Sequence, residues 1–324
     1  MTAQYLAFIK TIMKNYIPGL MLLFLPVAGM TANLDSELRE AAWVGQEDQV
    51  IRLLQQGASP NSSSGFGKTA LMFAVEEGNE MVADILIANG ADINAKSVAG
   101  CTALTFASEG GYTSIVKNLL NLKAKSSNKT RAGWDALMIA TRYNHTDVMQ
   151  VLISHNANIN TADKDGMTAL MTAAEKGLLE AVKILLEADA DMHIRNRDGA
   201  TAMITAASNG RLNVLKLLLN KGANINALSD DGATALFWAA SNGHLDTVKL
   251  LLDEGSNIDH QDFQGNTPIM EAVSAGAEQV VRLLLDHNAD ISLTNKDAKN
   301  VLDIARNQKK DNLFKILLNK SSKK

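Results

Sequence analysis

The residues that most resemble enzyme chemistry are Gly67-Lys68-Thr69, because a phosphate-binding loop ends in this order. Such a loop holds phosphate with backbone N–H groups and needs another glycine five residues before Gly67, where this chain has Ser62. We therefore expect neither a nucleotide site nor a catalytic residue. Two carboxylate pairs are interpreted as solvated tips rather than as acid/base pairs: Glu76-Glu77 and Asp230-Asp231.

Residue spacing gives no support for metal or cofactor binding. The chain has no His-Glu-x-x-His pair and no Cys-x-x-Cys pair, which are the spacings of common zinc sites. Cys101 is the only cysteine, so it cannot form an intramolecular disulfide. We therefore expect no cofactor and no bound metal. The six histidines stand in separate parts of the chain: His145, His155, His193, His244, His260 and His287.

A spacing of 33 residues runs through almost the whole chain. A self-similar period of this length indicates stacked supersecondary units, each of which buries its apolar face only against its neighbours. A stack of this kind usually presents a surface, so the chemistry to expect is recognition rather than catalysis. The period is marked by nine alanines: Ala41, Ala74, Ala107, Ala140, Ala173, Ala206, Ala239, Ala272 and Ala305.

Other columns in the same register predict a pair of helices in every repeat. A turn glycine such as Gly67 stands two residues before a helix-capping residue, and a Leu pair such as Leu218-Leu219 suits the buried stripe of the second helix. The capping column is Ser36, Thr69, Thr102, Asp135, Thr168, Thr201, Thr234, Thr267 and Asn300. Left-handed turns between the two helices are expected at Gly45, Gly78, Gly111, Asn144, Gly177, Gly210, Gly243 and Gly276.

With these columns the chain resembles the ankyrin-repeat family. The resemblance covers about residues 34–320 and implies an all-α solenoid of helix-turn-helix units joined by extended turn/hairpin segments. It rests on three stretches: Gly265-Asn266-Thr267-Pro268-Ile269-Met270-Glu271-Ala272, Leu283-Leu284-Leu285 and Gly222-Ala223-Asn224-Ile225-Asn226. The family's proline after the Thr survives only at Pro268, and its histidine is absent, so the family's Thr–His hydrogen bond cannot form. We expect the methionines in the histidine column to be core: Met72, Met138, Met171 and Met270.

The resemblance also implies where a partner binds, because members of the family commonly use the turn tips and the residues after the alanine column, along a concave surface. The predicted partner-binding residues are Arg131, Trp134, Arg142, Tyr143, Phe66 and Phe263. Trp, Tyr and Arg are enriched at interface hot spots, and the first four of these residues are expected to lie near one another. An alternative stays open, in which Trp134 is partly buried and covers a neighbouring repeat. Phe237 and Trp238 are interpreted as core.

Residues 1–32 do not fit the period and resemble a secretory signal peptide. They contain a basic start, an apolar run and small residues: Lys10 and Lys14, residues 20–25, and Ala28, Gly29 and Ala32. Cleavage after Gly29 fits best, and cleavage after Ala32 also fits. The alternative is an uncleaved membrane anchor, although a membrane span needs about 20 apolar residues. We expect residues 33–324 to form the array, with the first and last of about nine repeats acting as caps.

Net charge argues against a nucleic-acid partner. The formal charge is −4, and removal of residues 1–32 leaves 29 basic against 35 acidic residues, or −6. Affinity for nucleic acid depends on clustered basic residues that neutralise phosphates. We therefore predict a non-catalytic, monomeric scaffold that binds a protein partner of unknown identity and is periplasmic or secreted. The alternatives are a self-assembling structural element and the same scaffold tethered to a membrane by an uncleaved N-terminal segment.

Overall fold

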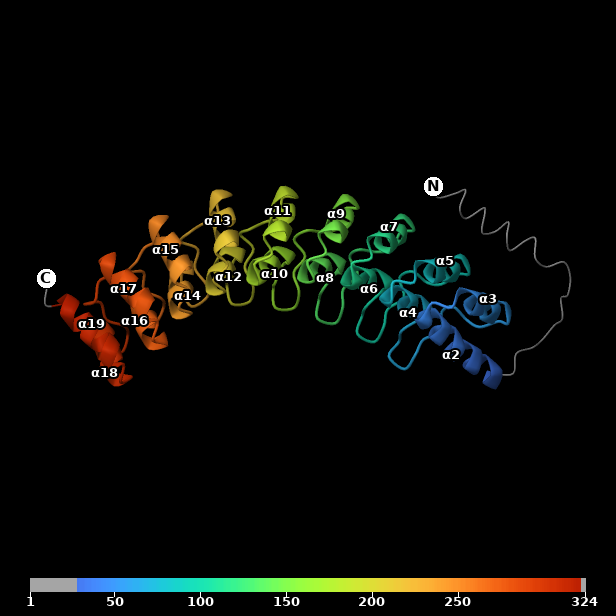
Figure 1. Ribbon diagram of the computed structural model, residues 1–324, viewed down its shortest axis with the longest axis horizontal. Coiled ribbons are helices and arrows are strands. Elements are labelled where there is room, and N and C mark those ends of the chain that lie inside the picture. Colours follow the sequence, from blue (N-terminus) through green and yellow to red (C-terminus); the bar gives the residue numbers. More distant parts are fainter. Residues whose placement is uncertain (1–27, 322–324) are drawn as a thin grey trace. The chain divides into compact units, whose positions relative to one another are not determined.

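The chain folds into paired helices, which form two compact units that divide between Arg131 and Ala132. The computed structural model describes residues 28–321 (Figure 1). In the first unit, the first helix of each pair is α2 (Ala28–Val44), α4 (Ala70–Glu76) or α6 (Ala103–Gly110). The second helix is α3 (Glu47–Gln55), α5 (Glu80–Ala88) or α7 (Thr113–Asn121).

The second unit contains six more helix pairs. Its first helices are α8 (Ala136–Arg142), α10 (Ala169–Lys176), α12 (Ala202–Ser208), α14 (Ala235–Ser241), α16 (Pro268–Ala275) and α18 (Val301–Asn307). Its second helices are α9 (Thr146–Ser154), α11 (Leu179–Glu187), α13 (Leu212–Asn220), α15 (Leu245–Asp253), α17 (Glu278–Asp286) and α19 (Asp311–Ser321). The all-α helix-turn-helix architecture is therefore as predicted.

Within each unit, the helices pack in two rows. The first helices form one row, in which α4 contacts α2 and α6, and α14 contacts α12 and α16 (Figure 1). The second helices form the other row, in which α13 contacts α11 and α15. The alanine column lies at the centre of the first row, where Ala41 is 3% exposed and every later member is fully buried. A larger side chain in this column would separate neighbouring first helices.

The capping column behaves as predicted in seven repeats. The side chain of each of these residues accepts a hydrogen bond from the backbone N–H three residues later: Thr69, Thr102, Asp135, Thr168, Thr201, Thr234 and Asn300. The prediction for Ser36 is wrong, because α2 continues through this residue. The first repeat has Leu34 in place of the turn glycine, so no turn interrupts the helix.

Every repeat has a residue with left-handed backbone at the predicted turn between its two helices. The turn between paired helices takes a positive φ at each predicted glycine and also at Asn144 (+59°). Lys309 is a ninth member of this column that was not predicted, and its φ is +55°. Asn and Lys reach this region at a cost that glycine does not have.

A ladder of single backbone hydrogen bonds joins the turn tips within each unit. In the first unit, the Val98 N–H donates to Phe66 O at 2.9 Å, and the Arg131 N–H donates to Ala99 O at 2.8 Å. In the second unit, the same bond recurs 33 residues apart, as when the Phe263 N–H donates to Asp231 O at 2.8 Å. These bonds hold the tips in register, so a side chain at one tip lies beside the tip of the next repeat.

The predicted signal peptide or membrane anchor lies outside the described residues, apart from its last five residues, which belong to α2. It therefore stays a prediction. Within residues 28–321, no helix combines the length and the apolarity that a membrane crossing requires.

Candidate functional site

The second unit brings Trp134 and Arg142 into contact. Asp135 caps α8, so Trp134 stands just before the helix, and Arg142 is its last residue. The Arg142 guanidinium carbon lies 4.5 Å from the centroid of the Trp134 ring. A cation over an indole face is attracted by the negative charge density of the ring. Arg142 is exposed and Trp134 is half-buried, so the pair presents its charge to solvent.

The next turn anchors the Trp134 ring. Its Nε1–H donates to Asp163 Oδ2 at 2.9 Å, and the other oxygen of Asp163 accepts the backbone N–H groups of Asp165 and Met167, both at 2.9 Å. The carboxylate is thus fixed by its own turn before it holds the indole. Trp134 therefore does cover a neighbouring repeat, as the alternative interpretation predicted, and its N–H group is already used inside the protein.

Tyr143 adds a second aromatic surface at the end of α8. It is the C-cap residue, its side chain is 48% exposed, and its ring stacks on that of His145 with centroids 6.3 Å apart and an angle of 13° between the rings. Rigid, exposed aromatic and guanidinium groups are the usual anchors of protein interfaces. Arg142 contacts Trp134 and precedes Tyr143 in the chain, and we call these three residues the α8 surface.

The other three predicted binding residues lie on turn tips. Phe66 and Arg131 are exposed in the first unit, on turn tips two repeats apart, and Phe66 is 80% exposed. Phe263 is 58% exposed on a tip of the second unit, roughly four repeats beyond Trp134 along the chain. These tip side chains are therefore open to solvent, and their role in partner binding stays a prediction.

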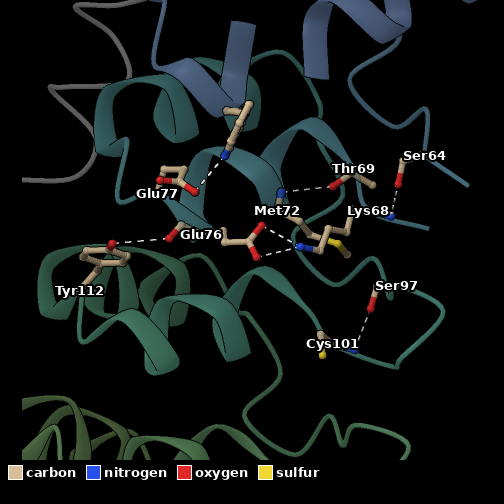
Figure 2. Close-up of polar contacts among 10 residues, drawn as sticks. Ser64, Lys68, Thr69, Met72, Glu76, Glu77, Ser97, Cys101 and Tyr112 are labelled. Atoms are coloured by element: carbon tan, nitrogen blue, oxygen red, sulfur yellow. Dashed lines mark hydrogen bonds and ion pairs between the residues drawn. The ribbon is translucent and has the colours of Figure 1, made fainter. Parts of the chain in front are cut away.

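The first unit carries an ion pair that the sequence analysis missed. The Lys68 Nζ lies 2.7 Å from both oxygens of Glu76 (Figure 2). The ammonium also lies 4.7 Å from the centroid of the Phe106 ring. Lys68 and Glu76 occupy the same two repeat positions as Trp134 and Arg142, 66 residues earlier. The eight-residue spacing between these columns could have predicted both contacts. Glu76 is thus a paired carboxylate rather than a solvated tip.

The structure explains the phosphate-loop resemblance without a nucleotide. Gly67 takes a φ of +74° in the turn, Lys68 pairs with Glu76, and the Thr69 side chain accepts the Met72 N–H (Figure 2). Each residue of the motif therefore has a structural role in its repeat. Among residues 28–321, no group of three His, Cys, Asp or Glu side chains is arranged to hold a metal ion.

Trp238 differs from its sequence interpretation as core. Phe237 is 5% exposed and belongs to the core, whereas Trp238 is half-buried and lines a hollow at the tips of the second unit. The two rings meet edge to face, with centroids 6.0 Å apart. The reason for the difference is helical periodicity: the residue before the alanine column lies at the edge of the buried stripe.

A model of three ankyrin repeats matches residues 38–130, 113–196, 188–262 and 247–324. These matches overlap and span the chain from residue 38 to residue 324. The chain belongs to the ankyrin-repeat family. Ankyrin repeats generally mediate protein–protein interactions, and ankyrin domains are typically non-catalytic. No curated protein matches this chain.

The ankyrin fold tolerates the missing histidines of this chain because other buried side chains fill their place, and in four repeats the side chain is methionine. The four methionines in that column are at most 2% exposed, as predicted for core. One threonine hydroxyl is left without a partner, in the repeat that keeps the family's Thr-Pro pair at Thr267-Pro268. The hydroxyl of Thr267 is buried and has no hydrogen-bond partner in the described part of the chain, so the predicted cap bond is absent there. The four residues are Met72, Met138, Met171 and Met270.

Proposed function

We propose that this ankyrin array is a non-catalytic scaffold that binds a protein partner through the α8 surface. Phe66, Arg131 and Phe263 stay candidate contacts on the turn tips of their own units. The observation that carries the proposal is the Arg142 guanidinium over the anchored Trp134 ring. This pair is held in place before any partner arrives, so binding loses little side-chain entropy. The partner contacts the guanidinium and the Tyr143 ring, while the Trp134 N–H stays on Asp163.

We also propose that the scaffold is exported. The support is the order of features in residues 1–32, with Lys10 and Lys14 before the apolar run at residues 20–25. Sequencing of the mature N-terminus tests this part alone. A chain that starts at Met30 or Asn33 supports export, and a chain that keeps residues 1–29 in a membrane fraction supports a tether instead.

The binding surface is tested by cross-linking the full-length protein in its native host and identifying captured proteins by mass spectrometry. The test variant is Arg142→Ala/Tyr143→Ala, which leaves the Trp134–Asp163 bond in place. The matched control is Arg282→Ala, which removes an exposed arginine that pairs with Glu278 on α17. We expect one partner to be captured by the wild type and by the control and to be lost from the test variant.

Two results contradict this proposal. If the same proteins are captured by the wild type and by the test variant, the α8 surface is not the binding site. If only copies of the chain are captured, the protein is a self-assembling element rather than a scaffold for another protein. Circular dichroism of each variant shows whether the fold is retained before either result is interpreted.

A further inference from the structure

The second unit contains a hollow at its turn tips that the α8 surface does not use. Its volume is about 340 Å³, and it is lined by the tips before α14 and α16 and by residues of these two helices. The lining combines four carboxylates with three aromatic rings, together with Ser241 and Gln264. The carboxylates are Asp230, Asp231, Asp262 and Glu271, and the rings are Phe237, Trp238 and Phe263.

Backbone geometry positions the Phe263 ring at the hollow. The Phe263 N–H donates to Asp231 O, which sets the Phe263 side chain beside the preceding tip. The Phe263 ring lies so close to Gly232 that a Cβ there would be 2.5 Å from Cδ1 of the ring. Gly232 also takes a φ of +76°. The glycine therefore serves both the turn and the ring, and Phe263 is held over the hollow while remaining 58% exposed.

Two of the four carboxylates are already engaged. Asp230 pairs with Arg195 at 2.7 Å, and Asp262 accepts the N–H groups of Gln264 and Asn266 at 2.9 and 2.7 Å. These contacts hold the Asp230 and Asp262 carboxylates in place at the hollow.

The other two carboxylates have no cation beside them. Glu271 accepts only a long hydrogen bond of 3.4 Å from the Ser241 hydroxyl, and neither Glu271 nor Asp231 has an ion pair in the described part of the chain. No Lys or Arg lines the hollow. Burial, with a smaller contribution from the charge of Asp262, raises the pKa of Glu271. The raised pKa is the expected signature of a carboxylate whose charge is not compensated.

We propose that this hollow, which we call the acidic–aromatic hollow, binds an arginine side chain of a basic segment of the partner protein. The inference rests on the proposed scaffold function and names the chemistry of its partner. A guanidinium suits the lining because it stacks on aromatic faces and donates forked N–H groups to carboxylates. A neutral small molecule does not fit, because such sites are mostly apolar with few polar groups. A metal ion does not fit, since these carboxylates form no metal-binding group.

The probe is the peptide acetyl-Gly-Arg-Gly-amide, titrated into the full-length nitrogen-15-labelled protein and followed through the indole N–H resonances. The chain has three tryptophans, so Trp43 and Trp134 serve as internal references. The citrulline analogue of the peptide keeps the shape of the arginine and loses its charge. We expect a saturable shift of the Trp238 resonance with the arginine peptide and at least about tenfold weaker binding of the citrulline peptide.

Two variants distinguish specific binding in the hollow from nonspecific attraction of the peptide to acidic residues. Asp231→Asn/Glu271→Gln should weaken binding of the arginine peptide by about tenfold or more, because both uncompensated charges are removed. Asp198→Asn is the matched control, since Asp198 occupies the position of Asp231 one repeat earlier and does not line the hollow. This control should bind the peptide as the wild type does.

The inference is overturned if the Trp238 resonance does not move, if both peptides move it equally, or if the double variant and Asp198→Asn bind alike. Its failure is distinguishable from failure of the scaffold function. A partner that is still lost from Arg142→Ala/Tyr143→Ala in cross-linking supports the scaffold even when the peptide does not bind. The carboxamide variants keep the size and shape of the carboxylates, so a loss of binding with an unchanged spectrum elsewhere reports the site itself.

Discussion

Arg142, the last residue of α8, places its guanidinium 4.5 Å from the centroid of the Trp134 ring, which belongs to the residue just before the N-cap of the same helix. A seven-residue helix thus joins its two ends through a side-chain contact. The two residues of this contact have different roles, which the sequence alone did not distinguish. Trp134 is anchored to Asp163 and stabilises the tips, whereas Arg142 is exposed and meets solvent.

The first prediction follows from this difference in roles. Arg142→Ala should weaken binding of the cross-linked partner by roughly 2 kcal/mol, because exposed arginines on a fixed aromatic platform are typical hot spots. It should leave the free energy of unfolding within about 0.5 kcal/mol of the wild type, as expected for an exposed residue. Isothermal titration with the purified partner measures the first quantity, and urea denaturation measures the second.

Trp134→Phe tests the structural role of the hydrogen bond from Trp134 to Asp163. Phenylalanine keeps a ring under Arg142 but cannot donate to Asp163, so stability should fall by about 1 kcal/mol, the usual net value of a hydrogen bond. Partner affinity should change far less than in Arg142→Ala. A large loss of affinity with unchanged stability would show instead that the Trp134 N–H contacts the partner.

The Lys68–Glu76 pair should contribute more to stability than the exposed ion pairs of the chain. The Lys68 and Glu76 side chains are 25% and 35% exposed, and the ammonium also faces two aromatic rings. We expect Glu76→Gln to lower the free energy of unfolding by about 1 kcal/mol, since hydrogen bonds to charged groups exceed neutral ones. Glu180→Gln is the control, because Glu180 is 63% exposed and pairs with Lys183. It should change stability by less than about 0.5 kcal/mol in the same urea titration.

Two threonine caps in neighbouring repeats should respond differently to the same change. Thr234 Oγ1 accepts the Phe237 N–H at 3.3 Å, so Thr234→Val should cost about 1 kcal/mol. The buried Thr267 hydroxyl has no hydrogen-bond partner in the described residues, so Thr267→Val should cost little or should stabilise the fold. Urea midpoints of the two variants compare the caps directly. Equal losses of stability would contradict the assignment of an unsatisfied hydroxyl.

The raised pKa of Glu271 predicts a pH-dependent effect of Glu271→Gln. Below the ordinary value of 4.5, the carboxyl is protonated in both the folded and the unfolded chain, so wild type and variant should be equally stable. As pH rises above 4.5, the unfolded chain loses this proton first, and the folded wild type loses stability until its own, higher pKa is passed. The variant should therefore be more stable than the wild type at pH 7.5 and not at pH 4.

The control for this pH effect is Asp262→Asn, which keeps an oxygen for the turn N–H groups and removes the neighbouring charge that contributes to the shift. In that background the gain from Glu271→Gln at pH 7.5 should shrink but not vanish, because burial is the larger cause. A gain that is the same at both pH values would contradict the assignment. Denaturation in urea at the two pH values measures each case.

The sequence by itself determined the repeat, its boundaries and most of its local structure, because these depend on contacts between residues close in the chain or one period apart. Gly67 and Thr69 determine the turn and the helix start in their own repeat. The small side chains of the alanine column allow neighbouring first helices to pack closely. The exception shows the same rule, since Ser36 lacks a preceding turn glycine and therefore lies inside α2. Exposure of tips such as Phe66 could also be predicted, because no structural column constrains them.

Only the tertiary structure decided which side chains of neighbouring repeats meet. Trp134 and Arg142 were expected near each other, but the bond from Trp134 to Asp163 depends on how the next turn folds back beside the first. The acidic–aromatic hollow depends on four carboxylates from two repeats, of which two are already engaged and two are not. A sequence lists charges in order along the chain, whereas the energy of a charge depends on its neighbours in space and on its exposure to water.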